Sequence, residues 1–292
     1  MTRALVLGGT RFFGKRLVEL LLANGVETTI ATRGQTSDPF GDQVNRIQLD
    51  RENRNSLEAG LGTGEWDVVY DNICYSPDSA QDACDLFKDR VGKYVFTSSM
   101  SVYEGGALIP EKVFDPYSYP LQKGSRHDFA YGEGKRLAEA VFAQKAPFPV
   151  SMIRFPIVLG TDDYTRRLHF HVEHIAREQT IGIPNVEAEM VFIRSDEAAR
   201  FLRWQADPLL TGPFNACSTG TVALETLLGW IELAVGKKAV LASETEKEDM
   251  SPFGVANTWT ASNEKGSKAG FPFLTLSEWL PELVESIARE TT

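Results

Sequence analysis

The stretch that decides the fold is Gly8–Gly14, which reads GGTRFFG and separates two segments of different hydrophobic period. Before it, Ala4–Leu7 is a continuous apolar run, typical of a strand buried on both faces. After it, Leu17–Leu22 repeats apolar residues with a helical period, and Asn24 with Gly25 supplies a helix stop. Glycines at such a turn let the backbone approach a diphosphate, whose charge rests on the helix N-terminus. The stretch predicts a dinucleotide-binding loop; a tight turn needed only for packing is the alternative.

The first half of the chain continues to alternate short apolar runs with amphipathic segments, which is typical of parallel β-α-β units. The further strands that we expect are Thr28–Ala31, Arg46–Leu49, Asp67–Tyr70, Lys93–Thr97 and Val150–Ile153. A helix is expected near Asp128–Gln144. The pattern predicts an α/β fold, a doubly wound parallel sheet of the Rossmann type with a smaller C-terminal substrate domain.

The second half of the chain is less regular. Residues 160–184 are polar, charged and rich in histidine, and we expect a lid or substrate region there. Val191–Ile193 is expected to return a strand to the sheet. Helices are expected at Ser195–Ala206, Val222–Val235 and Leu276–Arg289, and exposed loops at Lys237–Lys268. We expect a cofactor domain of residues 1–160, with 190–220 returning to it, and a substrate domain of residues 161–189 and 221–292.

The bulk composition is ordinary for a globular protein, with 292 residues, 42% of them hydrophobic and 24% charged. The formal net charge of −10 disfavours nucleic-acid and membrane partners, because an acidic surface repels phosphate groups. The three cysteines show no Cys-x-x-Cys spacing and suit free thiols in a reducing compartment. No stretch approaches the ~18 apolar residues that span a bilayer, and no signal-like region follows Met1. We therefore expect a cytoplasmic protein, either a monomer or a homodimer.

The end of the second expected strand bears on the choice of cofactor. NAD-binding units usually place an acid there to hold the ribose 2′-hydroxyl, whereas residues 30–34 read IATRG and contain no acid. Arg33 is placed to pair with a 2′-phosphate, and Arg11 in the glycine loop adds a second guanidinium. NADP is therefore the expected cofactor, with NAD possible; two exposed surface arginines without such a role are the alternative.

Tyr131 and Lys135 are four residues apart and share one face of the expected helix. A tyrosine with a pKa of ~10 is a poor base at neutral pH, and a nearby lysine supplies the cation that proton transfer needs. Gly132 and Gly134 are poor helix formers, and we expect them to allow a close approach of cofactor or substrate. Ser99 follows the fifth expected strand at the carboxyl edge of the sheet, where it can hold a substrate oxygen; a cap or turn is the alternative.

Several stretches spread over nearly the whole chain carry a family resemblance. They are Gly8–Gly14, Phe96–Tyr103, Tyr131-x-x-x-Lys135, Ile153–Gly160, Phe192–Asp196 and Gly212–Ala216. These stretches resemble the NAD-dependent epimerase/dehydratase family of extended short-chain dehydrogenases/reductases. Within that family the chain looks most similar to the atypical branch that contains the chloroplast stem-loop-binding proteins, which share the Gly-Gly-Thr-Arg-Phe loop.

The resemblance implies roles for individual residues. Ser99 would orient the substrate, Tyr131 would be the acid/base, and Lys135 would bind the nicotinamide ribose and lower the pKa of the tyrosine. Asp50 would lie near the adenine. The full set expected to bind the cofactor is Gly8, Gly9, Thr10, Arg11, Phe12, Phe13, Gly14, Arg33, Asp50, Asn72, Ile73, Cys74, Thr97, Tyr131, Lys135, Phe155 and Ile157.

Three departures from the family pattern narrow the expected activity. The middle glycine of the loop is Arg11. The acid pair that sugar-nucleotide dehydratases carry after the active-site hydroxyl is Met100 with Ser101, so no acid is present there to drive water elimination. The asparagine and arginine that nucleotide-sugar epimerases offer to the sugar diphosphate correspond to Ile157 and Met190. Dehydration is therefore not expected, and a full nucleotide sugar ranks no higher than a smaller sugar-like substrate.

His169, His171 and His174 form a cluster whose imidazoles would suit a metal. On a helix the three do not converge on one face, and on a strand His174 faces away from the other two. We therefore expect no metal and a role at the surface or in a substrate lid. Arg166 and Arg167 precede the cluster, and the cationic lining that results would favour an anionic or polyhydroxylated substrate.

The function predicted from the sequence is that of an NAD(P)-dependent oxidoreductase or epimerase. It would transfer a hydride between the nicotinamide and a carbinol or carbonyl carbon of a sugar-like or other polar small molecule. Return of the hydride to the opposite face of the same carbon gives epimerisation, and otherwise the outcome is net reduction or oxidation; the sequence leaves both open. The alternative is a non-enzymatic NADP-binding or RNA-associated protein on the same fold.

Overall fold

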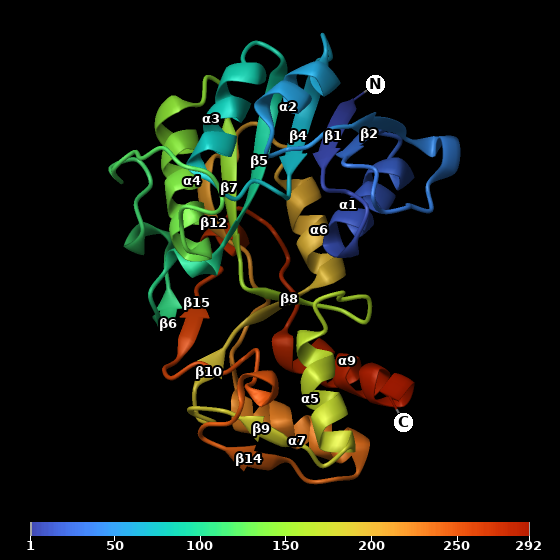
Figure 1. Ribbon diagram of the computed structural model, residues 1–292, viewed down its shortest axis with the longest axis vertical. Coiled ribbons are helices and arrows are strands. Elements are labelled where there is room, and N and C mark those ends of the chain that lie inside the picture. Colours follow the sequence, from blue (N-terminus) through green and yellow to red (C-terminus); the bar gives the residue numbers. More distant parts are fainter. Residues whose placement is uncertain (1, 292) are drawn as a thin grey trace. The chain divides into compact units, whose positions relative to one another are not determined.

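The computed structural model describes residues 2–291, and the chain divides into two units (Figure 1). The first unit comprises the chain up to Glu104, Glu111–Pro156 and Ser195–Ala216. The second unit comprises Gly105–Pro110, Ile157–Arg194 and the chain from Cys217 onward. No helix among residues 2–291 is long and apolar enough to cross a membrane.

A seven-stranded parallel sheet forms the centre of the first unit, in the order β12-β7-β5-β4-β1-β2-β3. Its strands are β1 (Arg3–Leu7), β2 (Glu27–Thr32), β3 (Asn45–Gln48), β4 (Trp66–Asp71), β5 (Val91–Ser99), β7 (Val150–Phe155) and β12 (Gly212–Asn215). The chain runs outward from β1 to β3 and then returns to the other side of β1 with β4. The predicted doubly wound, Rossmann-like fold is confirmed. Ligands of such sheets bind beyond the carboxyl ends of the strands at this switch between β1 and β4.

Helices pack on this sheet, and its central strands are buried on both faces. The elements are α1 (Phe12–Ala23), α2 (Arg54–Leu61), α3 (Pro77–Leu86), α4 (Tyr131–Lys145) and α6 (Ser195–Trp204), with 3-10 turns at Gly41–Gln43, Met100–Val102 and Glu111–Val113. Helix α1 packs against α6, and α3 packs against α4. Leu5 and Val69 belong to one core cluster, while their neighbours Ala4 and Val68 are equally buried. Burial on both faces explains why these strands are continuous apolar runs.

The second unit is built from small sheets and a group of helices. Its strands are β6 (Gly106–Ile109), β8 (Ile157–Leu159), β9 (Thr180–Gly182), β10 (Glu189–Met190), β11 (Phe192–Arg194), β13 (Val222–Ala223), β14 (Val240–Ala242) and β15 (Trp259–Ala261). Its helices are α5 (Arg167–Ala176), α7 (Leu224–Val235), α8 (Glu264–Lys268) and α9 (Leu276–Thr291), with a 3-10 turn at Lys247–Asp249. The strands form one sheet in the order β13-β10-β15-β6 and two pairs, β11-β8 and β14-β9. Helices α5, α7 and α9 pack against one another around a shared apolar core.

One strand prediction was wrong in its pairing. The segment Val191–Ile193 does contribute to a strand, β11, but β11 pairs with β8 and does not join the large sheet. The strand that returns to the large sheet is β12, which pairs with β7. Its sequence, GPFN, is short and contains Pro213, which cannot donate a ladder hydrogen bond and is tolerated because β12 is an edge strand. This composition carries almost no strand signal.

Candidate active site

The glycine loop turns sharply between β1 and α1. Gly8 has φ +85°, a left-handed conformation that favours glycine, and its amide donates a hydrogen bond of 3.2 Å to Ala31 O. A Cβ on Gly14 would lie 2.4 Å from Gly8 O, so only glycine lets α1 start this close to the strand. The first and third glycines of the motif therefore do what a dinucleotide loop requires of them.

The start of α1 suits an anionic group. No side chain caps this helix end, and its first turn contains no acidic residue. Arg11 precedes the helix, in the place of the middle glycine, with an extended backbone and an exposed side chain. A helix N-terminus of this kind attracts a diphosphate through its amides and its dipole. The residues present fit the nicotinamide dinucleotide that the loop predicts.

The ends of β1, β4 and β5 are connected by a chain of hydrogen bonds. Thr97 Oγ1 donates to Asn72 Oδ1 at 2.7 Å, and Asn72 Nδ2 donates to Gly8 O at 3.5 Å. Three of the residues expected to bind the cofactor therefore lie together beyond the carboxyl ends of neighbouring strands. That edge is where ligands of open α/β sheets bind.

A buried ion pair lies behind this edge, and the sequence did not reveal it. Arg51 Nη2 donates to Asp71 Oδ2 at 2.8 Å, and both side chains are 1% exposed or less. Tyr94 OH donates to the same carboxylate oxygen at 2.6 Å. Asp71 Oδ1 in turn accepts the amide of Ile73 at 3.2 Å, so the pair fixes the backbone of one of the expected cofactor residues.

The tyrosine and lysine of the motif have opposite environments. Tyr131 is the first residue of α4 and its side chain is 54% exposed. Lys135 is buried, and its Nζ donates hydrogen bonds of 2.7 Å to Cys74 O and to Thr97 O. Ser99, at the end of β5, is partly exposed and its Oγ accepts the amide of Ser101 at 3.1 Å. An exposed phenol one helical turn from a buried ammonium is an arrangement that can exchange a proton with a bound substrate.

The two glycines between Tyr131 and Lys135 have a different role from the one expected. A Cβ on Gly132 would lie 2.4 Å from Ser101 O, and a Cβ on Gly134 would lie 2.5 Å from Tyr75 O. The close neighbours are therefore backbone carbonyls of the protein, and the prediction that the glycines admit cofactor or substrate was wrong. They let the start of α4 pack directly onto the segments that follow β4 and β5.

Tyr103 is a poor second choice for the acid/base. Its side chain is buried, its hydroxyl donates to Asn215 Oδ1 at 2.7 Å, and Arg154 Nη1 donates to the same hydroxyl at 2.8 Å. Burial raises the pKa of Tyr103 to about 12. Of Tyr103 and Tyr131, only Tyr131 combines an exposed side chain with a neighbouring lysine.

A second buried network supports the site, and the sequence analysis also missed it. Glu139 Oε2 accepts from Arg154 Nη2 at 2.6 Å, and Glu139 Oε1 accepts from Ser98 Oγ at 2.5 Å. Both charged side chains are fully buried. Glu139 lies one turn beyond Lys135 on the face that carries Tyr131, so the i, i+4, i+8 spacing was a signal that could have found it.

The remaining predicted cofactor residues have separate positions. Arg33 follows β2 and is exposed, and Asp50 follows β3, where its Oδ1 accepts the amide of Glu52 at 3.0 Å. The ring of Phe155, at the end of β7, lies 5.7 Å from the ring of Phe13. Ile157 begins β8 and belongs to the second unit.

Two of the three histidines of α5 do not lie at the surface, which corrects that prediction for them, whereas His174 is partly exposed. His169 and His171 are buried in the second unit, because the residues around them form an amphipathic helix whose inner face they share with Leu168 and Val172. His171 Nδ1 lies 2.9 Å from Arg167 O and therefore carries the proton, so Nε2 accepts from Ser251 Oγ at 2.7 Å. His169 and His171 therefore do not contribute a cationic surface. No group of three metal-binding side chains occurs among residues 2–291.

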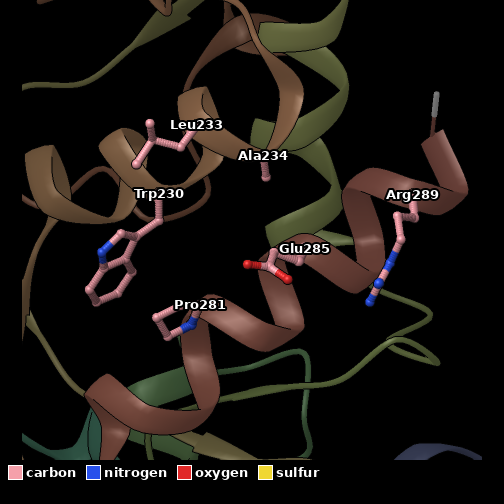
Figure 2. A pocket seen from close by; sticks show the side chains of 6 residues that line it. All are labelled: Trp230, Leu233, Ala234, Pro281, Glu285 and Arg289. Atoms are coloured by element: carbon pink, nitrogen blue, oxygen red, sulfur yellow. The ribbon is translucent and has the colours of Figure 1, made fainter.

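A groove in the second unit lies between α7 and α9 (Figure 2). Its lining is Trp230, Leu233, Ala234, Pro281, Glu285 and Arg289. It offers no tyrosine, lysine, histidine or serine to exchange a proton with a substrate. The groove therefore lacks the chemistry of the site in the first unit.

The sheet, the glycine turn and the Tyr131–Lys135 pair define an α/β protein of the dinucleotide-binding type. A family model described as the NAD dependent epimerase/dehydratase family matches residues 4–207. The chain belongs to this family.

A curated relative is similar to this chain in sequence, and solved structures are similar to it in fold. A stretch of 199 residues is 26% identical to the chloroplast stem-loop binding protein of 41 kDa b from Arabidopsis thaliana, covering 63% of this chain. The match spans 49% of that protein, which means that this chain covers about half the length of the curated relative. The fold is similar to that of a UDP-glucose 4-epimerase from Thermus thermophilus, in complex with NAD, with 16% identity, TM-score 0.73 and full coverage of both chains. It is also similar to a UDP-N-acetylglucosamine 4-epimerase from Bacillus cereus, with 18% identity, TM-score 0.72 and coverage of 99% and 96%.

Proposed function

We propose that the protein transfers a hydride between NADP and a carbinol or carbonyl carbon of a sugar-like or other polar small molecule, acting as a reductase or as an epimerase. The observation that carries this proposal is the pairing of the exposed Tyr131 phenol with the buried Lys135 ammonium beside the glycine loop. The solved epimerases with this fold include one crystallised with UDP-glucose, which supports a polar, sugar-like substrate.

In this proposal each residue of the site has its own role. When bound, the nicotinamide accepts or donates the hydride. Tyr131 takes the hydroxyl proton when a carbinol is oxidised and returns it when a carbonyl is reduced. Lys135 favours the phenolate through its charge, and Ser99 orients the substrate oxygen. Gly8, Gly14 and the N-terminus of α1 would hold the diphosphate.

The preference for NADP rests on the end of β2. Arg33 is exposed there, and residues 30–34 contain no acid to hold a free 2′-hydroxyl. The relatives crystallised with cofactor contain NAD, so binding of both cofactors to one protein sample is the comparison to make.

The structure offers fewer free cations for an anionic substrate than the sequence suggested. Arg166 forms an ion pair with Glu173 and adopts a left-handed backbone, φ +53°, at the start of α5. With His169 and His171 buried, the accessible members of the predicted cationic lining are Arg166, Arg167 and the partly exposed His174. We therefore propose a polyhydroxylated substrate ahead of a strongly anionic one. A substrate panel with the Arg166→Ala/Arg167→Ala variant tests this, because an anionic substrate requires a raised KM in that variant.

The direct test of the proposed function is Tyr131→Phe, which removes only the transferable proton. Turnover of carbonyl and sugar substrates should fall at least about a hundredfold, while NADPH affinity stays close to that of the parent. Lys135→Ala should lower both the turnover and the affinity for NADPH. A Tyr131→Phe protein that keeps most of its turnover would show that another group moves the proton.

A second candidate function is RNA association, and the match to the stem-loop binding protein is the observation that favours it. The formal net charge of −10 opposes it. A gel-shift titration with stem-loop RNA separates the two candidates, because binding that survives physiological salt with no turnover of any carbonyl substrate would favour the RNA function. We further propose a cytoplasmic monomer or homodimer, to be checked by cell fractionation and sedimentation.

A further inference from the structure

Tyr75 occupies a central place among the charged and aromatic groups of the site. It follows Cys74 in the connection between β4 and α3. The Nζ of Lys135 lies 4.6 Å from its ring centroid, and Cζ of Arg126 lies 4.5 Å from it. The ring of Tyr131 is 6.3 Å away at an interplanar angle of 47°. The sequence analysis assigned Tyr75 no role.

Lys135 needs such a neighbour because its ammonium has no carboxylate partner among residues 2–291. The side chain is 1% exposed, and its hydrogen-bond partners are two carbonyl oxygens. Burial disfavours the charged form of a lysine by removing water. Beyond the two carbonyls, the compensation comes from aromatic faces. The nearest are those of Tyr75 and of Phe96, whose centroid is 4.9 Å from Nζ, and the Tyr131 ring is farther away at 5.9 Å.

We propose that Tyr75 is a positioning residue that holds Lys135 as an ammonium beside Tyr131, and that it thereby sets the alkaline limit of the proton transfer. The inference rests on the proposed function, because it assigns Tyr131 the proton. The Tyr75 backbone packs directly against the helix that carries Lys135, since a Cβ on Gly134 would lie 2.5 Å from Tyr75 O.

Of the two nearest aromatic neighbours, Tyr75 is the one that connects Lys135 to the rest of the site. Phe96 is fully buried and packs against Phe142, with centroids 4.9 Å apart, as part of the core. Tyr75 contacts Arg126, which is half exposed and lies 3.6 Å from Glu52 Oε1. Because Arg126 is hydrated and paired, the buried Lys135 depends more on the shared ring than Arg126 does.

Two other ionisable groups around Lys135 are either neutral or paired. Burial raises the pKa of the Cys74 thiol to about 12, so this group stays neutral. Glu139, on the same helix face, is neutralised by its ion pair with Arg154. The remaining titratable neighbours are Tyr131 and Tyr75 themselves, together with the Arg126–Glu52 pair.

The experiment compares Tyr75→Phe, which keeps the π face, with Tyr75→Leu, which removes it. Tyr117→Leu is the matched control, because Tyr117 is 55% exposed and lies outside the site. In Tyr75→Leu the Tyr131 phenol should keep its proton to higher pH, so the alkaline limb of the kcat/KM profile for carbonyl reduction should move to higher pH by about one unit, and kcat should fall about tenfold. The affinity for NADPH at neutral pH should stay within about threefold. Tyr75→Phe should restore the profile of the parent.

A measurement without turnover separates the inference from the proposed function. Ultraviolet difference titration of the phenolate, with the matching Tyr131→Phe protein subtracted, reports the ionisation of Tyr131 directly. Ionisation at higher pH in the Tyr75→Leu background than in the Tyr75→Phe background supports the inference even if no substrate turns over. Turnover with an unchanged alkaline limb and an unchanged phenolate titration overturns the inference and leaves the proposed function standing. If Tyr75→Leu does not fold, Tyr75→Met, which fills similar space with a flexible chain, replaces it.

Discussion

The carboxylate of Glu139 and the guanidinium of Arg154 form an ion pair of 2.6 Å with no exposed surface on either side chain. The pair joins α4 to β7. Glu139 also accepts a hydrogen bond from Ser98, the residue that precedes Ser99. Arg154 also donates to Glu111 O at 2.8 Å and to Phe114 O at 3.0 Å. The strand end and the helix that carry the candidate active site are therefore tied to one buried charge pair.

Glu139→Gln should destabilise the protein strongly, because it leaves the Arg154 guanidinium buried without a counter-charge. The expected loss in the free energy of unfolding is roughly 3–5 kcal/mol, measured by urea denaturation. Glu264→Gln is the control. Glu264 pairs with Lys268 on the surface, and the loss of this pair should not change the free energy of unfolding detectably. A Glu139→Gln protein as stable as the parent would mean that the pair does not hold the unit together.

Gly14→Ala should damage the cofactor loop without any loss of polar groups. The added Cβ would meet Gly8 O at 2.4 Å, so α1 must shift, at a cost of about 1–3 kcal/mol. Because α1 shifts, the affinity for the dinucleotide, measured by calorimetry, should fall as well. Gly229→Ala is the matched control: no atom lies within 4 Å of the new Cβ inside α7, and the substitution should stabilise the helix by about 0.5–1 kcal/mol. Unchanged dinucleotide affinity in Gly14→Ala would contradict the role given to this loop.

Features that depend on local order along the chain could be predicted from the sequence. The strands β1, β4 and β5 stand out because burial on both faces makes them continuous apolar runs. Tyr131 and Lys135 stand out because one helical turn brings them together. The glycine loop is equally local, since its turn and its close helix contact lie within seven residues.

Features that depend on partners distant in sequence could not be predicted. Arg51 and Asp71 are 20 residues apart and pair only because β3 and β4 end at the same edge of the sheet. Tyr103 and Asn215 are 112 residues apart. The burial of His171 likewise depends on the packing of α5, which the polar composition of residues 160–184 conceals.

Arg33→Ala should remove the preference for NADP that we propose. A charge-assisted contact to the 2′-phosphate is worth about 1.5–3 kcal/mol, so the affinity for NADPH should fall tenfold or more. NADH lacks this phosphate, and its affinity for the same protein is the internal control and should stay unchanged. Equal affinities for NADPH and NADH in both the parent and the variant would rule out Arg33 as the residue that selects the cofactor.

His171 should make the stability of the second unit depend on pH. Burial lowers the pKa of His171 to about 4, and its neutral form is held by Ser251 and by Arg167 O. Between that value and the usual ~6.5 the unfolded chain binds the proton and the folded chain does not, so stability falls as the pH drops through this window. The loss should approach about 3 kcal/mol at pH 4, in urea titrations across the range. His171→Gln should flatten this dependence, whereas His127→Gln, at an exposed position, should leave it as in the parent. An identical pH dependence in the parent and in His171→Gln would show that the buried imidazole does not govern it.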